Sequence, residues 1–446
     1  MMNQTKIKFW GGLNTIGGNI AEIRYGNDRV IFDFGQAYNP ADVLLTNAKG
    51  RDDSRVADKL KLGILPKIDG IYSEKDLLGT NFNLETAEES KLNTAIFISH
   101  LHLDHIGSID AIPGKIPFYM SVESKDLLEQ LMIIGEPPFK EMDEIRTFNN
   151  EETIMVGDIK VTAIQIDHDT HGSVSLLIET PDKKICYSGD IRMHGQRPEI
   201  NHAWMKKMNE QKLDMLLMEA TSFSPNTDES EKKSHRDLYS EPEIPVVLEQ
   251  KLNKAHGVVF FNFYHRNLDR LNHYINVSHQ CGRILVLEAP TAQIAATFFP
   301  NASFKVLKQA DATGWVTTLY EKYDQITVAE INENPVRYLV QNDFTNVLNL
   351  IDYKVDSSMY IHSNGMPLGA FDPAFNSLLS FLEKIGVQYE TVATSGHADQ
   401  EAVLDIIDKI LPNNLVIWHS LAPETVVPRN ENQKVLRPEL DTWYNV

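Results

Sequence analysis

The chain has 446 residues, more than one ordinary hydrophobic core accommodates, so two or more structural units are expected. Its hydrophobic content of 42% and charged content of 23% are typical of a soluble globular protein. The formal net charge of −20 argues against a protein that coats polyanions, because such binding depends on Lys and Arg neutralising phosphates. A nucleic-acid substrate held in a local cleft with a divalent cation is compatible with this charge.

The N-terminal residues lack the apolar stretch of a signal peptide, and no run of about 18 apolar residues predicts a membrane span. The two cysteines, Cys186 and Cys281, offer no disulfide framework, which fits a reducing cytosol. Neither belongs to a Cys-x-x-Cys pair, so packing is their expected role. We therefore expect a cytoplasmic protein without a membrane partner.

The first segment has the pattern of short strands separated by tight turns. Strand character is found in residues 6–10, 19–24 and 29–32. Residues 26–28 favour a hairpin between the last two. Asp33 then follows, either as a solvated turn residue or as a carboxylate that holds metal ligands. Residues 36–93 show only short helical patches, which is long for a connection, so we expect a lid-like excursion near the site.

The most informative stretch is residues 94–105, where an apolar, β-branched run leads into metal-binding side chain types. These side chains are His100, His102, Asp104 and His105. His100 and His102 are two residues apart, so they project from the same face of an extended backbone. Neutral imidazole and carboxylate are ligands that divalent metals such as Zn²⁺ accept. The alternative is a polar loop that is rich in histidine by chance, and the density of these groups disfavours it.

Two later strands also end in residues able to bind a metal. After a helical pattern at residues 125–134, residues 159–166 alternate like a strand and lead to His168. A further strand leads to Asp190 in Ser-Gly-Asp. An aspartate at a strand end is usually a cap or turn residue, so only its place after the other candidates favours metal binding.

The order His-x-His-x-Asp-His, then a distant His, then Ser-Gly-Asp resembles the metallo-β-lactamase superfamily. The resemblance implies two β-sheets in a sandwich, helices outside, and a dinuclear metal site on one edge. It implies one metal bound by His100, His102 and His168, another bound by Asp104 and His105, and Asp190 bridging them. Asp33 would match the strand-end aspartate beside the site. Two dications about 3.5–4 Å apart lower the pKa of a shared water and hold the attacking and leaving oxygens.

Three further segments narrow the resemblance. An apolar strand ends at Glu219, and Thr-Ser-Gly-His-Ala surrounds His397. A last apolar strand ends at His419. Between the latter two, residues 403–411 keep helical spacing and Pro412 ends the pattern.

Together these segments resemble the β-CASP branch of the superfamily, nucleases that include ribonuclease J. The resemblance implies that His419 completes the second metal's ligands. It also implies that His397, paired with Glu219, protonates the leaving oxygen, because a neighbouring carboxylate keeps an imidazole protonated and oriented. The expected catalytic residues are thus Asp104, Glu219 and His397. A turn at a helix entry and a surface strand end are the alternative interpretations of His397 and Glu219.

The region between Glu219 and His397 is the expected inserted cap. Residues 226–243 are dense in charge and proline, which suits a linker, and strand-like runs then alternate with helical stretches as in a parallel sheet. The expected fold is α/β: a four-layer αββα metallo-β-lactamase sandwich with an inserted α/β β-CASP cap. Its expected domains are residues 1–225, the first part of the sandwich, residues 226–390, the cap, and residues 391–446, the remainder of the sandwich.

Two departures from ribonuclease J concern substrate binding. Residues 341–343 read Gln-Asn-Asp where that family carries a Thr-Gly-Ser loop, and Ser420 follows the last histidine where the family usually has glycine. The family's 5′-phosphate pocket uses Ser, Gly and backbone amides. The nearest matches in this chain are Ser363, Asn364, Ser395 and Gly396. A polar loop is the alternative for Ser363 and Asn364.

The leading hypothesis is a metal-dependent phosphodiesterase that hydrolyses RNA, with a water activated by two metals and His397 as general acid. The expected cofactors are two Zn²⁺, or alternatively Mn²⁺, and the expected partners are single-stranded RNA and a second copy in a homodimer. A small-substrate metallo-hydrolase of the same fold is one alternative, disfavoured by the cap and the Glu219–His397 pair. A non-catalytic RNA-binding relative is another, disfavoured by the complete ligand set.

Overall fold

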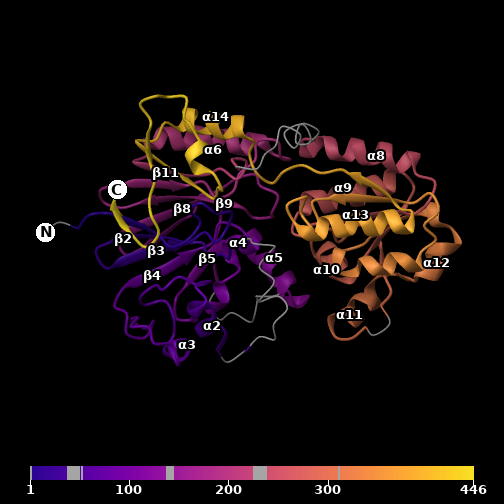
Figure 1. Cartoon of the computed structure of the whole chain (residues 1–446), viewed down its shortest axis with the longest axis horizontal. Coiled ribbons are helices and arrows are strands. Elements are labelled where there is room, and N and C mark those ends of the chain that lie inside the picture. The colour runs from indigo at the N-terminus through magenta and orange to yellow at the C-terminus, as the bar shows by residue number, and fades with distance from the viewer. Residues whose placement is uncertain (1–2, 38–50, 52–53, 137–144, 225–238, 310–311) are drawn as a thin grey trace. The chain divides into compact units, whose positions relative to one another are not determined.

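The computed structural model describes residues 3–37, 51, 54–136, 145–224, 239–309 and 312–446. The chain forms two compact units, coloured along the sequence in Figure 1. Unit 1 contains residues 1–132, 136–227 and 396–446, and unit 2 contains residues 133–135 and 228–395. Parts of the expected lid (38–50 and 52–53) and of the expected linker (226–238) lie outside the described residues.

The first sheet of unit 1 has seven strands, with the C-terminal strand at one edge. Their spatial order is β21 (Trp443–Asn445), β1 (Lys6–Phe9), β2 (Ala21–Tyr25), β3 (Asp28–Phe32), β4 (Asn93–Phe97), β5 (Phe118–Ser121) and β6 (Ile145–Phe148). The predicted hairpin is confirmed, because β2 and β3 are antiparallel and Tyr25 pairs with Asp28. β3 and β4 are parallel, so their carboxyl ends meet at one edge of the sheet.

The second sheet of unit 1 also has seven strands. Their order is β20 (Lys434–Leu436), β19 (Asn414–Trp418), β11 (Met215–Glu219), β10 (Lys184–Tyr187), β9 (Val174–Glu179), β8 (Ile159–Gln165) and β7 (Thr153–Val156). β10, β11 and β19 are parallel, and β8 runs the same way because β8 and β10 both pair antiparallel with β9. Four carboxyl ends therefore lie along one edge.

The core of unit 1 lies between the two sheets. Alternate side chains of both sheets point into it, among them Ile7, Phe32, Phe97, Leu176, Leu217 and Trp418. The outer face of the second sheet is covered by α6 (Pro198–Gln211) and α14 (Gln400–Ile410), which bury Trp204 and Ile406. On the first sheet, Ile31 and Ile96 are also fully buried, so that sheet has a covered outer face too.

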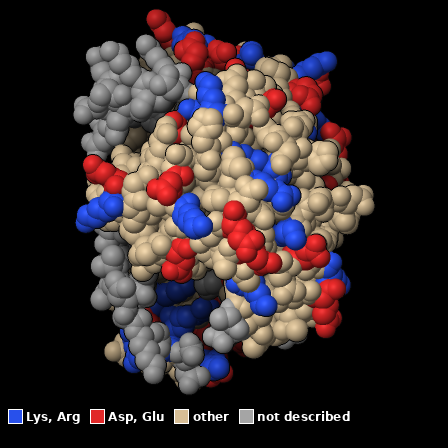
Figure 2. Space-filling model, turned by 90° about the vertical axis from the view of Figure 1, so that its right-hand side faces the viewer, with Lys and Arg blue, Asp and Glu red and all other residues tan. Residues whose placement is uncertain are grey.

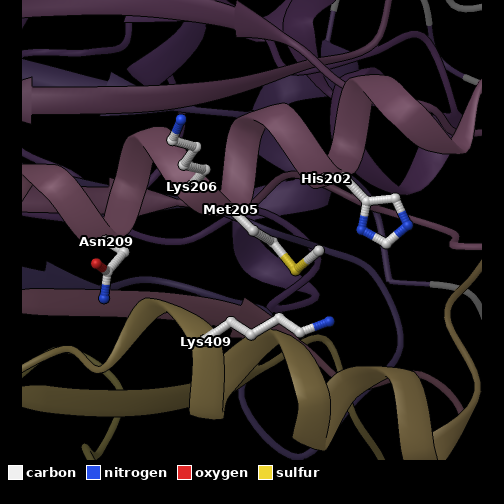
Figure 3. Close-up of a pocket in the computed structure, with 5 residues that line it drawn as sticks. All are labelled: His202, Met205, Lys206, Asn209 and Lys409. Carbon is white, nitrogen blue, oxygen red and sulfur yellow. The ribbon is translucent and has the colours of Figure 1, made fainter.

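The remaining described α-helices of unit 1 follow strands of the first sheet or the segment between them. They are α2 (Arg55–Lys61), α3 (Glu74–Leu77), α4 (Leu103–Ile106) and α5 (Val122–Ile133). α5 confirms the helix predicted at residues 125–134. Between α6 and α14 a hollow of about 310 Å³ lies at the surface, lined by His202, Met205, Lys206, Asn209 and Lys409 (Figure 3). None of these five residues belongs to the candidate metal groups found among the described residues.

Unit 2 contains a third seven-stranded sheet, and all its strand pairs are parallel. The order is β15 (Gln325–Ile326), β14 (Lys305–Leu307), β13 (Ile284–Leu287), β16 (Tyr338–Gln341), β12 (Val259–Phe263), β17 (Met359–Ser363) and β18 (Gln388–Thr391). The α-helices are α8 (Ile244–Lys254), α9 (Leu268–Gln280), α10 (Ala289–Phe298), α11 (Trp315–Lys322), α12 (Val328–Glu333) and α13 (Pro373–Ile385). The predicted alternation of strands and helices is therefore confirmed. Lys and Arg side chains intermingle with Asp and Glu on the face drawn in Figure 2.

A buried ion pair ties the elements of unit 2 together. Arg270 of α9 donates from Nε and Nη2 to the two carboxylate oxygens of Glu241, at 2.9 and 3.0 Å. Both side chains are fully buried. Arg270 Nη1 also donates to Ser363 Oγ at 2.6 Å, and that hydroxyl donates to the Val392 carbonyl. Among the described residues, no helix has the length and apolar character required to cross a membrane.

Candidate metal centre

The candidate metal ligands lie at the carboxyl ends of strands in unit 1. His100 follows β4, His168 follows β8, Asp190 follows β10 and His419 directly follows β19. His419 has a φ of +51°, so the chain turns sharply at the strand end and directs the imidazole across the sheet edge. The remaining ligands, His102, Asp104 and His105, lie in or next to the single turn of α4.

The donor atoms of the predicted ligands come together in two groups that share one carboxylate, and a third, overlapping group contains Glu219, His397 and His419. The first group is His100, His102, His168 and Asp190, and the second is Asp104, His105, Asp190 and His419. Within each group every donor atom lies within 4.8 Å of every other. Asp190 Oδ2 lies 3.2 Å from His105 Nε2 and 3.7 Å from His100 Nε2, between the two groups. This is the arrangement expected for two adjacent metal ions with a bridging carboxylate.

Each imidazole of these groups has a polar partner on one ring nitrogen, which orients the other nitrogen toward the donor group. The pairs are His100 Nδ1 with Ser99 Oγ, His102 Nε2 with Thr170 Oγ1, His105 Nδ1 with Asp33 Oδ2, His168 Nδ1 with the Gly396 carbonyl, and His419 Nδ1 with Thr221 Oγ1. Such partners fix the tautomer and the orientation of a metal-binding histidine.

The atoms that face the centre include buried groups without a hydrogen-bond partner. Within the part of the chain that the structure describes, these are His100 Nε2, His105 Nε2 and both oxygens of Asp190. An unsatisfied buried polar atom is costly, so several of them facing one another need an explanation. A divalent cation in each group would coordinate these atoms, and the imidazole and carboxylate donors fit such an ion.

Electrostatics keeps the first group's imidazoles neutral, which is the form that binds a metal. Burial lowers the pKa of His100 well below its ordinary value and that of His102 to about 3. Burial alone would raise the pKa of Asp190, but His105 and His419 hold it well below the ordinary value. Asp190 is therefore an ionised carboxylate.

Asp33 is the carboxylate that supports the ligands, which settles the two interpretations of its sequence position. Its Oδ2 accepts from Ser99 Oγ at 2.8 Å and from Tyr187 Oη at 2.6 Å, and it pairs with His105 Nδ1 at 2.8 Å. Since Ser99 Oγ also contacts His100 Nδ1 at 3.0 Å, Asp33 orients one imidazole of each group. The side chain is fully buried and is not a solvated turn residue.

The glycine-rich segment after β1, residues 11–18, contacts the backbone that carries Asp104 and His419 of the second group. The backbone N–H of His419 donates to the Gly12 carbonyl at 3.0 Å, and that of Gly18 donates to the Asp104 carbonyl at 2.9 Å. A Cβ atom at Gly17 would lie 2.3 Å from Cβ of Asp104, so only glycine permits this approach. The segment thus fixes the backbone that carries two ligands of the second group.

His397 and Glu219 form the predicted pair beside the centre. His397 Nδ1 lies 3.3 Å from Glu219 Oε1 and 3.7 Å from Asp190 Oδ2. The Glu219 carboxylate is fixed by the backbone N–H groups of Ile191 and Thr221, at 3.2 and 2.9 Å. Burial would lower the pKa of His397, but Glu219, followed by Asp190, raises it to about 10. The imidazole is therefore held in its protonated form, as a general acid requires.

The residues matched to a phosphate pocket lie in two places. Ser363, Asn364 and Ser395 belong to unit 2, and Gly396 belongs to unit 1. The Ser363 hydroxyl is buried and engaged by Arg270 and Val392, while Asn364 Oδ1 accepts from the Thr394 N–H at 3.2 Å.

Several residues that organise the site were not predicted from the sequence. Arg192 donates from Nε to Asp167 Oδ1 at 3.0 Å, and both side chains are fully buried. This pair joins the loop that carries His168 to the loop that carries Asp190. Asn201 of α6 reinforces it, because its Oδ1 accepts from the Asp167 N–H at 2.8 Å. The sequence signal for this network was Asp167, a carboxylate directly before His168.

Comparison with known proteins shows similarity to the beta-lactamase superfamily and to ribonuclease J. The sequence model of the beta-lactamase superfamily domain matches residues 75–241. Ribonuclease J of Mycoplasma genitalium is 22% identical over 441 residues, covering 93% of this chain and 68% of that protein. Ribonuclease J of Pyrococcus abyssi is 23% identical, covering 63% of this chain and 58% of that protein.

The fold has a close counterpart among solved structures. A crystal structure of a protein of unknown function from Enterococcus faecalis V583 superposes with a TM-score of 0.82 and 27% identity. The match covers 99% of this chain and 100% of that one. The family-model match contains the ligands from His100 to Asp190, and the longer relatives extend over most of the chain. The chain therefore resembles proteins of the beta-lactamase superfamily in the segment that holds these residues, and ribonuclease J over most of its length.

Proposed function

We propose that this protein is a metal-dependent phosphodiesterase that hydrolyses RNA. The observation that carries the proposal is the convergence of two donor groups on the shared Asp190, with the His397–Glu219 pair beside them. RNA as the substrate is supported by the similarity to proteins named ribonuclease J. The expected products are shorter RNA chains.

We propose two metal ions, Zn²⁺ or alternatively Mn²⁺, held by the residues of the two donor groups. The first ion would be held by His100, His102 and His168, the second by Asp104, His105 and His419, and both by Asp190. When bound, such a pair supplies an activated water and a clamp for the attacking and leaving oxygens of a phosphodiester. Five supporting groups would hold the imidazoles in the required tautomers, namely Asp33, Ser99, Thr170, Thr221 and the Gly396 carbonyl.

His397 is the proposed general acid. Glu219 keeps its imidazole protonated, so a proton is present on the ring when the leaving oxygen needs one. The His397 side chain is 22% exposed, more than the fully buried His100 and His105, so it is open to an incoming group. Asp104 contributes as a ligand, with its Oδ2 3.0 Å from His419 Nε2.

Of the four residues matched to a phosphate pocket, Asn364 and Ser395 of unit 2 are the proposed contacts to an RNA phosphate, with unit 2 as the β-CASP cap. The Ser363 hydroxyl is not proposed as a contact, because it is buried and bonded to Arg270 and Val392. Single-stranded RNA is the proposed form, because the donor side chains His100, His105 and Asp190 are fully buried and an unpaired strand is thinner and more flexible than a duplex. We further propose a cytoplasmic homodimer. The free thiols of Cys186 and Cys281 are consistent with a reducing compartment, and light scattering of the purified chain measures the dimer.

The decisive experiment is an RNA hydrolysis assay with the metal-loaded protein. The substrates are 5′-monophosphorylated and 5′-triphosphorylated RNA, single-stranded DNA, and bis(p-nitrophenyl) phosphate. We expect cleavage of RNA and preference for one 5′ end. Cleavage of the small ester alone would favour a small-substrate hydrolase, and binding of RNA without cleavage by the metal-loaded protein would favour a non-catalytic relative.

A further inference from the structure

Asp169, the residue after His168, places a carboxylate against the first donor group. Its Oδ1 lies 3.2 Å from His168 Nε2 and 3.4 Å from His102 Nε2. The side chain is 13% exposed, and Oδ1 itself is buried without a hydrogen-bond partner in the part of the chain that the structure describes. His100 Nε2 and the Asp190 oxygens are buried and unpartnered in the same way. Like the candidate ligands, Asp169 thus has a buried oxygen without a hydrogen-bond partner among the described residues.

The local backbone is built to hold Asp169 there. A Cβ atom at Gly396 would lie 2.7 Å from Asp169 Oδ1 and 2.8 Å from Oδ2, so a larger residue there would push the carboxylate out of this position. The Gly396 carbonyl meanwhile pairs with His168 Nδ1 at 2.5 Å. Thr170, the next residue, reaches His102 Nε2 through its hydroxyl. The same short loop therefore contacts both imidazoles.

The distribution of carboxylates explains what Asp169 adds. Asp33 supports His105 directly and His100 through Ser99. The two imidazoles of the first group that Asp33 does not contact, His102 and His168, are those that Asp169 contacts. The second group also has its own carboxylate, Asp104, whereas the first group has only the shared Asp190. Asp169 supplies the missing negative charge.

Asp169 is not a member of the tetrad in which all donor atoms lie within 4.8 Å of one another. Its effect on an ion in that group therefore acts through its charge and through the two imidazoles. At His102, Asp169 lies beside the ring nitrogen that faces away from the donor group, where a carboxylate raises the basicity of a metal-binding imidazole and fixes its orientation. At His168, Asp169 lies beside Nε2, the nitrogen that faces the donor group, so it acts there through its negative charge.

We propose that Asp169 is a positioning residue for the first metal, and that it strengthens binding at that group and not at the second. The inference rests on the metal centre of the proposed function. It predicts that removal of the Asp169 charge lowers the metal affinity of the first donor group and leaves that of the second unchanged.

The test is calorimetric titration of metal-free protein with Zn²⁺, comparing wild type with Asp169→Asn. The substitution keeps the size of the side chain and removes its charge. We expect one of the two equivalents to bind about 10–100-fold more weakly and the other to keep its affinity. Asp126→Asn, an exposed aspartate on α5, is the matched control and should bind both equivalents as wild type does. Thermal unfolding of the metal-free variants checks that Asp169→Asn still folds.

Three outcomes would overturn proposals, and they are distinguishable. Wild-type affinity at both equivalents of Asp169→Asn rejects the role of Asp169 and leaves the metal centre intact. Equal weakening of both equivalents also rejects it, because the effect is then not specific to the first group. Wild-type protein that binds no Zn²⁺ rejects the proposed metal centre itself, and the role of Asp169 with it.

Discussion

The metal centre of unit 1 and the buried ion pair of unit 2 place charged side chains in the interior in opposite ways. In unit 2, Arg270 and Glu241 satisfy each other through two parallel hydrogen bonds. In unit 1, His100 Nε2, His105 Nε2 and Asp190 face one another without a hydrogen bond. The first arrangement is complete within the chain, whereas the proposed metal ions would complete the second.

This contrast separates residues that act in function from residues that hold the structure. Arg270 joins α9 to Ser363 and, through that hydroxyl, to the Val392 carbonyl, so its contacts are all internal. Asp190 instead lies between two groups of donors. Substitutions at the two places should therefore change different measured quantities, namely metal binding and turnover in unit 1 and the free energy of unfolding in unit 2.

The largest expected effect is on turnover. His397→Ala removes the proposed proton donor but none of the seven ligands, so RNA turnover should fall by about 10²–10⁴-fold with metal content unchanged. Turnover is measured on single-stranded RNA and metal content by elemental analysis. His202→Ala, at the hollow between α6 and α14, is the matched control and should retain full turnover. Equal turnover before and after His397→Ala would reject the general-acid assignment.

The next largest effect is expected on the stability of unit 2, where the buried ion pair lies. Arg270→Leu removes both hydrogen bonds that Arg270 donates to the buried Glu241 carboxylate, which should destabilise unit 2 by about 3–5 kcal/mol. Hydrogen exchange of peptides from β12 and β17 reports this loss, while peptides from β10 and β11 should keep their protection.

The double variant Arg270→Leu, Glu241→Leu removes both charges and is the control for this effect. It should recover much of the lost stability, because an apolar pair no longer buries an isolated carboxylate. Unchanged exchange in unit 2 of the single variant would show that the ion pair contributes nothing there.

The candidate metal ligands could be picked out from the sequence because they are clustered and lie where strand patterns end. Residues 94–105 contain four of the seven, and His168, Asp190 and His419 each follow an apolar run. The resemblance to a known family then grouped them. An alternating pattern likewise predicted β8, and compact apolar runs predicted β11 and β12.

The parts that the sequence did not predict depend on contacts between distant residues. Neither Thr170 nor Thr221 has a sequence signature, yet each orients an imidazole, and only folding shows which hydroxyl reaches which ring. β21 has three residues and pairs with β1 from the other end of the chain, so no local pattern predicts it. For α6, in contrast, the spacing of Trp204, Met205 and Met208 is a helical signal that could have been used.

Removing the metals should lower the stability of unit 1. An ion at a free concentration of about 100 times its dissociation constant stabilises the folded state by about 2.7 kcal/mol per site, and a chelator removes this contribution. Thermal unfolding with and without EDTA measures the loss, and added Zn²⁺ should restore the midpoint. An unchanged midpoint in a protein that has demonstrably lost its metal would argue that the donor groups are satisfied without an ion.

The smallest effect is a shift in pH dependence at Glu219→Gln. Burial lowers the pKa of His397, whereas Glu219, followed by Asp190 and Asp169, raises it to about 10. Removing the Glu219 charge therefore lowers this pKa, and His397 loses its proton at a lower pH. The alkaline limb of the profile of turnover against pH should move to lower pH by about one to three units.

A shift of that limb tests the electrostatic role of Glu219 separately from its structural one. The glutamine at residue 219 can still accept the Ile191 N–H through its amide oxygen, while its amide nitrogen then faces the Thr221 N–H and that one hydrogen bond is lost together with the charge. The metal content of Glu219→Gln is therefore measured as well, because Thr221 orients His419. Glu210→Gln, an exposed glutamate on α6, makes the same charge change away from the site and should leave the profile in place. A profile of Glu219→Gln that falls in height without moving would mean that Glu219 orients His397 but does not set its protonation.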